Sequence, residues 1–324
     1  MSVFDDASVL ITGGTGSFGK RFVRTLLDTT GVARVVVFSR DELKQYEMQQ
    51  LFPSEARLRY FIGDVRDYQR LRRALRGVHV VVHAAALKQV PAAEYNPFEA
   101  VKTNVLGAQN VIEAAIEQGV ARVMALSTDK ACSPVNLYGA TKLVSDKLFV
   151  SGNAYASGTP TRFAVVRYGN VAGSRGSVIP FFRQLASTGS LPITDERMTR
   201  FWITLEQGVS FVMDRLEHMH GGELYIPKIP SVKVVDLAKA IAPDAALEVV
   251  GIRPGEKIHE EMINVSDARS TVDMGDYYVI QPELDWWPKE QLDGTPVPSG
   301  FAYASDTNSH WLSYEELKAL VAHV

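Results

Sequence analysis

The stretch VLITGGTGSFG, residues 9–19, decides the fold, because it places a short apolar run directly before glycines at positions 13, 16 and 19. A tight turn from a strand into a helix needs these glycines. The chain must bend sharply, bring its backbone close to a pyrophosphate, and pack the helix on the strand. The helix N-terminus then offers free N–H groups to the phosphates. We therefore expect a dinucleotide site with contacts from Gly13, Thr15, Gly16, Ser17, Phe18 and Gly19.

Short apolar runs alternate with longer amphipathic stretches through the first half of the chain. Several runs are apolar at nearly every position, as strands covered on both faces must be. The expected strands are residues 8–12, 34–38, 58–62, 79–83, 122–126 and 163–167. The expected helices are residues 18–27, 41–51, 68–75, 100–117 and 137 to about 150. This alternation predicts an α/β protein with a Rossmann-type, doubly wound parallel sheet.

The regular alternation ends near Gly173, after which prolines interrupt shorter elements. We expect residues 1–172 to form the cofactor-binding domain and residues 173–324 a smaller substrate-binding lobe, with some chain crossing back to the first part. The composition, with 46% hydrophobic and 22% charged residues, is ordinary for a globular chain. A net charge of -3 gives no basic surface of the kind that nucleic-acid binding requires, so no such partner is expected.

Cysteine usage and hydropathy limit the cellular setting. Cys132 is the single cysteine, which excludes an intrachain disulfide and favours a reduced, cytoplasmic compartment. Acidic residues stand where a signal peptide would be basic, and no run of about 18 apolar residues predicts a membrane span. His79 and His83 fall on one face of a strand but have no third ligand in sequence, so we expect no metal site.

The end of the second expected strand favours NADP over NAD. An acid that binds the ribose 2′-hydroxyl is expected about 20 residues after the glycines. Ser39 and Arg40 occupy that place, with Lys44 one turn further along, and an arginine suits a 2′-phosphate. A solvated charge at a helix start is the alternative for Arg40. Asp64 and Val65, after the third strand, are expected at the adenine ring, although Asp64 also suits a helix cap.

Tyr138 and Lys142 are spaced to share one face of a helix. A lysine ammonium beside a phenol stabilises the phenolate, so we expect Lys142 to lower the pKa of Tyr138 toward neutrality. The phenolate can then take a proton from a sugar hydroxyl while hydride leaves the same carbon. Ser127, which follows the fifth strand, is expected to hydrogen-bond that hydroxyl.

These motifs resemble the extended short-chain dehydrogenase/reductases. The stretch STDKACSPVNLYGATK, residues 127–142, further resembles the UDP-N-acetylglucosamine 4,6-dehydratases. The stretches SRDELKQ, residues 39–45, and RPGEKIHE, residues 253–260, are similar to the 5-inverting type that acts in pseudaminic acid biosynthesis. The resemblance implies a cytoplasmic, homo-oligomeric hydro-lyase that acts on UDP-N-acetylglucosamine with tightly bound NADP, regenerated in each turnover.

The same resemblance implies roles for the residues after the fifth strand. Tyr138 takes the O4 proton, an unprotonated Lys130 takes H5, and a protonated Asp129 donates to the departing C6 hydroxyl, with Thr128 beside them. Hydride returns to C6, and C5 is reprotonated on its opposite face by Lys130, Asp129 or a water. The deoxythymidine-diphosphate hexose dehydratases carry Asp-Glu at these places, so Lys130 is a departure from them. A surface ion pair is the structural alternative for Asp129 and Lys130.

Further contacts carry less specific signals, and ordinary surface charges or turns are the alternative for each. Small residues after the fourth strand allow the cofactor backbone to pass, and an amide in the long helix is expected near it: Ala84, Ala85, Ala86 and Asn104. The residues expected to contact substrate are Lys88, Asn170, Ser177, Val178, Ile179, Arg200, Arg253 and Glu256.

Two other functions suit the same motifs. One is a UDP-sugar 4-epimerase or reductase, which needs hydride transfer but no elimination. The other is a non-catalytic NADP-sensing module, because a fold does not dictate a function. Retention of Tyr138 and Lys142, together with Asp129 and Lys130, favours the dehydratase over both.

Overall fold

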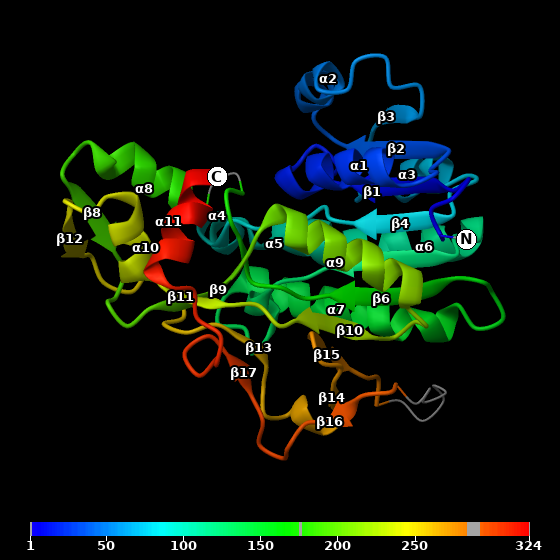
Figure 1. The fold of residues 1–324 in the computed structure, drawn as a ribbon. Coiled ribbons are helices and arrows are strands. Elements are labelled where there is room, and N and C mark those ends of the chain that lie inside the picture. The colour runs from blue at the N-terminus through cyan, green and yellow to red at the C-terminus, as the bar shows by residue number, and fades with distance from the viewer. Residues whose placement is uncertain (1, 175–176, 284–291, 324) are drawn as a thin grey trace.

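A computed structural model describes residues 2–174, 177–283 and 292–323 (Figure 1). Its described residues contain a sheet of ten strands in the order β16-β14-β15-β10-β6-β5-β4-β1-β2-β3. The first six strands in sequence pair in parallel throughout, which confirms the predicted α/β class and the strands expected from the apolar runs. Their bounds are β1 (Ser8–Thr12), β2 (Arg34–Ser39), β3 (Leu58–Ile62), β4 (Val80–His83), β5 (Arg122–Leu126) and β6 (Arg162–Val166).

Helices connect these strands and cover both faces of the sheet, as parallel crossovers require. They are α1 (Ser17–Thr29), α2 (Glu42–Gln50), α3 (Tyr68–Ala74), α4 (Val90–Tyr95), α5 (Pro97–Val101), α6 (Gly107–Gln118) and α7 (Leu137–Tyr155). Asp41 and Asp67 accept hydrogen bonds from backbone N–H groups at the starts of α2 and α3, so both helices begin at a side-chain cap.

Residues 100–117 are helical throughout, as expected, but the helix is not a regular α-helix over this range. A π-helical turn, η1 (Lys102–Leu106), separates α5 from α6. A π-turn inserts an extra residue into the helical ladder, and such turns occur often at functional sites. Apolar periodicity does not reveal the insertion, because the spacing on either side of it remains helical.

Shorter elements follow β6. The strands are β7 (Asn170–Val171), β8 (Ser190–Ile193), β9 (Thr199–Ile203), β10 (Leu224–Pro227), β11 (Ser231–Lys233), β12 (Ala246–Val249), β13 (Glu261–Ile263), β14 (Thr271–Asp273), β15 (Tyr277–Ile280), β16 (Thr295–Pro296) and β17 (Tyr303–Ala304). The helices are α8 (Val178–Ala186), α9 (Leu205–His218), α10 (Val234–Ile241) and α11 (Tyr314–His323), with short 3₁₀ turns at η2 (Asp129–Ala131) and η3 (Ala268–Ser270).

The chain after residue 173 contributes to two regions. In Figure 1, α8, α10, α11, β8 and β12 gather to the left of the large sheet. The strands β10, β14, β15 and β16 instead extend the large sheet itself, and α9 packs against α1. The predicted boundary between two lobes near Gly173 therefore stays a prediction. The large sheet contains strands from both sides of that boundary.

The order of the strands fixes where a ligand is expected. β1 lies between β2 and β4, so the chain turns toward opposite edges of the sheet on the two sides of β1. In open parallel sheets, ligands bind outside the carboxyl ends of the strands at such a switch point. All five residues of β1 are buried, so the strand that leads into this switch point is packed in the core.

Candidate active site

The glycine turn follows β1 at the switch point. Gly13 has φ +66°, and a Cβ there would lie 2.9 Å from the Ala85 backbone, so only glycine fits. Gly16 caps the N-terminus of α1, and a Cβ on Gly19 would collide with the backbone of Gly14. The turn thus brings the N–H groups of α1 to the cleft, as the sequence predicts.

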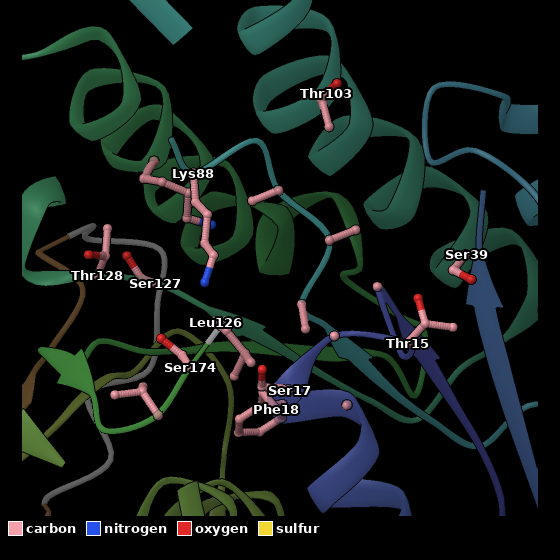
Figure 2. A pocket seen from close by; sticks show the side chains of 18 of the residues that line it. Thr15, Ser17, Phe18, Ser39, Lys88, Thr103, Leu126, Ser127, Thr128 and Ser174 are labelled. Carbon is pink, nitrogen blue, oxygen red and sulfur yellow. The ribbon is translucent and has the colours of Figure 1, made fainter. Parts of the chain in front are cut away.

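A cleft of about 460 Å³ runs along the carboxyl ends of the parallel strands (Figure 2). All the residues predicted to bind cofactor line it except Asn104, and so do all six predicted catalytic residues. The residues of the cofactor set in this lining are Gly13, Thr15, Gly16, Ser17, Phe18, Gly19, Ser39, Arg40, Lys44, Asp64, Val65, Ala84, Ala85, Ala86, Tyr138 and Lys142.

Asn104 lies behind the cleft, in the π-turn. It is buried; its side-chain oxygen accepts from the Leu87 N–H at 2.8 Å, and its side-chain nitrogen donates to the Leu87 carbonyl at 2.9 Å. The same nitrogen donates to Thr141 Oγ1 at 3.0 Å. The prediction of a cofactor contact is therefore not met: Asn104 joins the loop after β4 to α7, the helix that carries Tyr138.

One end of the cleft is cationic and lies beyond β2. The Arg40 guanidinium is half-exposed and lies 3.7 Å from Asp64, and Lys44 pairs with Asp41 at 2.9 Å. Asp64 also forms an ion pair with Arg66 at 2.7 Å. Burial acts to raise the pKa of Asp64, but Arg66 and Arg40 outweigh it and lower that pKa. Asp64 is therefore anionic, and Arg40 has no other carboxylate partner among the residues described.

The other end of the cleft holds the polar side chains that follow β5. The Thr128 side chain lies next to the phenol of Tyr138 and acts to lower its pKa, and Thr128 Oγ1 donates to Asp129 Oδ1 at 2.9 Å. Ser127, in contrast, donates its hydroxyl to Asp146 at 2.6 Å. Thr128 is therefore the hydroxyl next to the phenol, and the predicted bond from Ser127, which also lines the cleft, to a sugar hydroxyl stays a prediction.

The start of α7 packs directly on these residues. A Cβ on Gly139 would collide with the carbonyl oxygen of Lys130, so glycine is required after Tyr138 for this approach. The Asn136 side chain accepts from the Gly139 N–H at 2.8 Å and begins the helix. These contacts fix Tyr138 beside Thr128 and Asp129.

Asp129 and Lys130 form an ion pair at the cleft, with a buried carboxylate and a partly buried ammonium, instead of a surface pair. Asp129 is 1% exposed, and Lys130 Nζ lies 3.0 Å from its Oδ1. Glu260 Oε1 lies 3.0 Å from the same Nζ and is also buried. Burial by itself lowers the pKa of Lys130, but the two carboxylates outweigh it and raise that pKa. The expectation that its surroundings hold Lys130 unprotonated is therefore wrong for the resting chain.

The expected effect of Lys142 on Tyr138 is also absent in the chain alone. Burial raises the pKa of Tyr138 to about 12, against the opposing effects of Lys130 and the Thr128 hydrogen bond. Burial likewise lowers the pKa of Lys142, with Asp146 acting in the opposite direction. Desolvation thus dominates the pKa of both the buried phenol and the buried ammonium.

The predicted substrate contacts divide into two sets. Lys88 and Asn170 line the cleft; the Lys88 side chain points into it in Figure 2, and surrounding protein lowers the pKa of its ammonium. The other six lie outside this lining: Ser177, Val178, Ile179, Arg200, Arg253 and Glu256. Whether they contact a bound nucleotide stays a prediction.

Two of these six have roles in the fold that the sequence does not indicate. Arg200 donates to the carbonyls of Thr199, Lys257 and Ile258, so its guanidinium holds these segments together. Ile179 is fully buried in a small apolar cluster with Trp202. In both cases the neighbours come from strands and loops that sequence spacing does not place.

The sequence analysis missed several residues of the site. Thr103, Ser174 and Leu205 line the cleft, and Thr103 Oγ1 is buried with no hydrogen-bond partner among the described residues. Thr103 is aimed by the π-turn, which has no sequence signal. Glu260 stands in the quoted stretch 253–260, so only its position in the fold was needed to find it.

A parallel sheet with a glycine turn at its switch point, and a Thr-Tyr-Lys set across the cleft, defines an extended short-chain dehydrogenase/reductase. The sequence matches the family described as Polysaccharide biosynthesis protein over residues 9–282, and the chain belongs to this family.

Three relatives show how the chain compares with known proteins. It is 54% identical to a UDP-N-acetylglucosamine 4,6-dehydratase (inverting) of Campylobacter jejuni, over 99% of each chain. It is 42% identical to a UDP-glucose 4-epimerase of Rickettsia canadensis, over 98% of this chain and 96% of that one. The solved structure of Pen from Bacillus thuringiensis superimposes with a TM-score of 0.91 at 38% identity, covering 99% of this chain and 98% of the other. Both the fold and the chain length are thus shared with these relatives.

Two broader properties concern the described part of the chain. None of its helices combines the length and the hydropathy needed to cross a membrane. Cys132 is a buried free thiol whose pKa burial raises to about 12, so it is a poor nucleophile in this setting. Its side chain faces Glu261 and lies away from the cleft lining.

Proposed function

We propose that this protein is a UDP-N-acetylglucosamine 4,6-dehydratase that inverts C5, with UDP-2-acetamido-2,6-dideoxy-β-L-arabino-hex-4-ulose as its product. The observation that carries the proposal is the Asp129–Lys130 ion pair, 3.0 Å apart, in the same cleft as Tyr138 and Lys142. Oxidation alone needs no such pair, whereas elimination of water needs one acid and one base. The 54% identical relative carries the same activity in its name. A place at the first step of pseudaminic acid biosynthesis stays a prediction from the resemblance.

The cleft suits a nicotinamide dinucleotide. The turn at Gly13 leaves no room for a side chain where a pyrophosphate backbone would pass, and the N-terminus of α1 faces the same place. Thr103 Oγ1 and Asn170 Oδ1 belong to residues that line the cleft, and both atoms are buried without a hydrogen-bond partner in the described structure. Arg40, beyond β2, supports NADP as the form that is bound.

A nicotinamide dinucleotide held at the glycine turn and beside Arg40 would supply the hydride chemistry, oxidation at C4 and reduction at C6, so that no reductant would be consumed overall. The residues of the chain supply the proton transfers. Tyr138 removes the O4 proton as its phenolate. The nearby Lys130 ammonium favours that form, and the positive charge of a bound oxidised nicotinamide would favour it further, against the burial that keeps the phenol protonated in the ligand-free chain. The resulting 4-ketone acidifies H5, because the carbanion at C5 is delocalised into the carbonyl.

The Asp129–Lys130 pair provides both groups for the elimination through one internal proton transfer. In the resting chain the proton is on Lys130, and Asp129 Oδ1 is 3.0 Å away. Transfer of that proton produces an amine and a carboxylic acid, which are the base and the acid that the step requires. Lys130 then takes H5, and Asp129 gives its proton to the C6 hydroxyl, which leaves as water. C5 finally takes up a proton on its opposite face.

The direct experiment is incubation of the purified protein with UDP-N-acetylglucosamine and no added reductant. We expect mass spectrometry to show loss of one water, and NMR of the product to show the inverted configuration at C5. A Lys130→Met variant should still oxidise C4, detected as absorbance of reduced nicotinamide, but should form product at least about 1,000-fold more slowly. Normal dehydration by this variant would contradict the role of Lys130.

An epimerase is the second candidate, because a 42% identical relative is named UDP-glucose 4-epimerase. The same incubation separates the two functions. An unchanged mass with a changed sugar would establish the epimerase and remove the need for the Asp129–Lys130 pair.

A further inference from the structure

Glu260 reaches the catalytic lysine from a segment far away in the sequence. Its side chain is 3% exposed, and its Oε1 atom lies 3.0 Å from Lys130 Nζ. Its backbone N–H donates to Ser305 Oγ at 2.9 Å, which fixes the residue just before β13. A buried carboxylate held in this way is part of the site's construction and not a solvated charge.

The contact between Lys130 and Glu260 is surrounded by further charged side chains. Lys130 faces two carboxylates, those of Asp129 and Glu260, and its charge also acts on the phenol of Tyr138. Glu260 in turn faces Arg200 at 3.9 Å and Lys257 at 4.0 Å. Three cations thus surround the Glu260 carboxylate, and Lys130 is the one in closest contact with it.

The elimination makes use of only one of the two carboxylates. On the proposed function, the C5–H bond breaks, its electron pair stays on C5 as the enolate of the 4-ketone, and the proton forms an N–H bond on Lys130. Asp129 has by then accepted the proton that Lys130 gave up, so until it protonates the leaving hydroxyl it is neutral. During that interval Glu260 is the carboxylate still in contact with the new ammonium.

We propose that Glu260 is a positioning residue for the dehydration, orienting the amine of Lys130 and stabilising the ammonium that forms when Lys130 takes H5. Glu260 itself gains and loses no proton. The inference rests on the proposed function, because it assigns Glu260 a role only in the H5 step, and it predicts no change in C4 oxidation.

The test is the Glu260→Gln variant, assayed for dehydration across pH. Loss of this carboxylate lowers the pKa of Lys130, so the shared proton of the Asp129–Lys130 pair is lost at lower pH. We expect the alkaline limb of the kcat profile to move down by about one pH unit, and kcat to fall about 10- to 100-fold, with KM within about threefold. Absorbance of reduced nicotinamide should still appear in a single turnover.

Glu261→Gln is the matched control. Glu261 comes from the same segment and contacts residues 129–136, here called the catalytic loop, without touching Lys130. Its carboxylate accepts from Ser133 Oγ at 2.8 Å. We expect this variant to keep the wild-type alkaline limb. Equal changes in the two variants, or an unshifted limb in Glu260→Gln, would overturn the proposal and indicate a purely structural role.

Glu260→Asp covers the case in which the glutamine variant fails to fold. This variant keeps the carboxylate but moves it away from Lys130 by the length of one methylene group. We therefore expect kcat to fall while the alkaline limb stays near its wild-type position. An unchanged kcat would overturn the proposal. Failure of the proposed function is recognised separately, since then the wild-type protein would release no water from UDP-N-acetylglucosamine.

Discussion

Arg40 is the single residue on which the choice between NADP and NAD depends. It lies at the carboxyl end of β2, beside Ser39 and above Asp64, where the adenosine ribose of a dinucleotide at the glycine turn would lie. A guanidinium there is able to hold a 2′-phosphate through two parallel hydrogen bonds. Asp64 at 3.7 Å orients the side chain without neutralising it in a direct hydrogen bond.

Replacement of Arg40 should therefore change cofactor preference more than catalysis. In an Arg40→Ser variant we expect the Kd for NADP+ to rise about tenfold or more, with the Kd for NAD+ changed less than about threefold. Isothermal titration of cofactor-stripped protein measures both constants. Arg66→Met is the control, because Arg66 also pairs with Asp64 but does not line the cleft. Equal weakening of both cofactors by Arg40→Ser would argue against the NADP assignment.

At the residue scale, the sequence predicts which side chains meet but not the charges they carry. Thr128, Asp129, Lys130 and Tyr138 fall in one cleft, as expected from the strand that precedes them and the helix that follows. Their protonation depends on groups that spacing does not reveal. Glu260 enters from more than a hundred residues away and turns an expected amine into a resting ammonium. The preference for Thr128 over Ser127 likewise depends on side-chain direction, which alternates along an extended segment.

At the scale of elements, the parallel strands and their helices follow from local patterns, whereas the π-turn does not. Apolar runs mark β1 to β6 because both faces of the sheet are covered. The turn η1 instead depends on contacts between distant segments. It directs Asn104 toward the loop after β4, where the Asn104 side chain hydrogen-bonds both the N–H and the carbonyl of Leu87. A buried peptide group without such a partner is costly.

This contact predicts a large effect of one amide on stability. Asn104→Ala leaves the Leu87 N–H and carbonyl without their side-chain partner, so we expect the free energy of unfolding to fall by about 2–4 kcal/mol. Asn110→Ala is the control on α6, because its side chain makes one bond, to the Val65 carbonyl at 2.9 Å, and should cost about 1 kcal/mol. Urea unfolding followed by circular dichroism measures both. An equal loss of unfolding free energy in the two variants would show that the contacts of Asn104 contribute no more than one ordinary side-chain hydrogen bond.

At the scale of the whole molecule, the predicted nucleotide contacts and the chemical groups belong to distant parts of one chain. Residues 253–261, here called the crossing segment, extend from Arg253 and Glu256 to Glu260. It touches residues 129–136 at several points: Gly255 accepts from the Asn136 side chain at 2.7 Å, and Lys257 donates to the Cys132 carbonyl at 2.6 Å. The division into two lobes that the sequence predicts does not indicate these contacts, because they join segments far apart in the chain.

The crossing segment predicts that nucleotide binding is felt in the catalytic loop. If UDP binds at Arg253 and Glu256, it orders a segment that is bonded to residues 129–136, and two sites joined by such contacts share a coupling free energy. We expect UDP alone to slow amide hydrogen exchange in both segments of the wild-type protein. A Lys257→Met variant loses the bond to the Cys132 carbonyl, so protection should remain at 253–261 and fall at 129–136. Mass spectrometry of peptides from the two regions measures this directly. Equal protection of the catalytic loop in wild type and variant would mean that the contact does not transmit binding, and that the loop is already fixed by its own hydrogen bonds, such as that from the Asp129 N–H to the Tyr168 carbonyl.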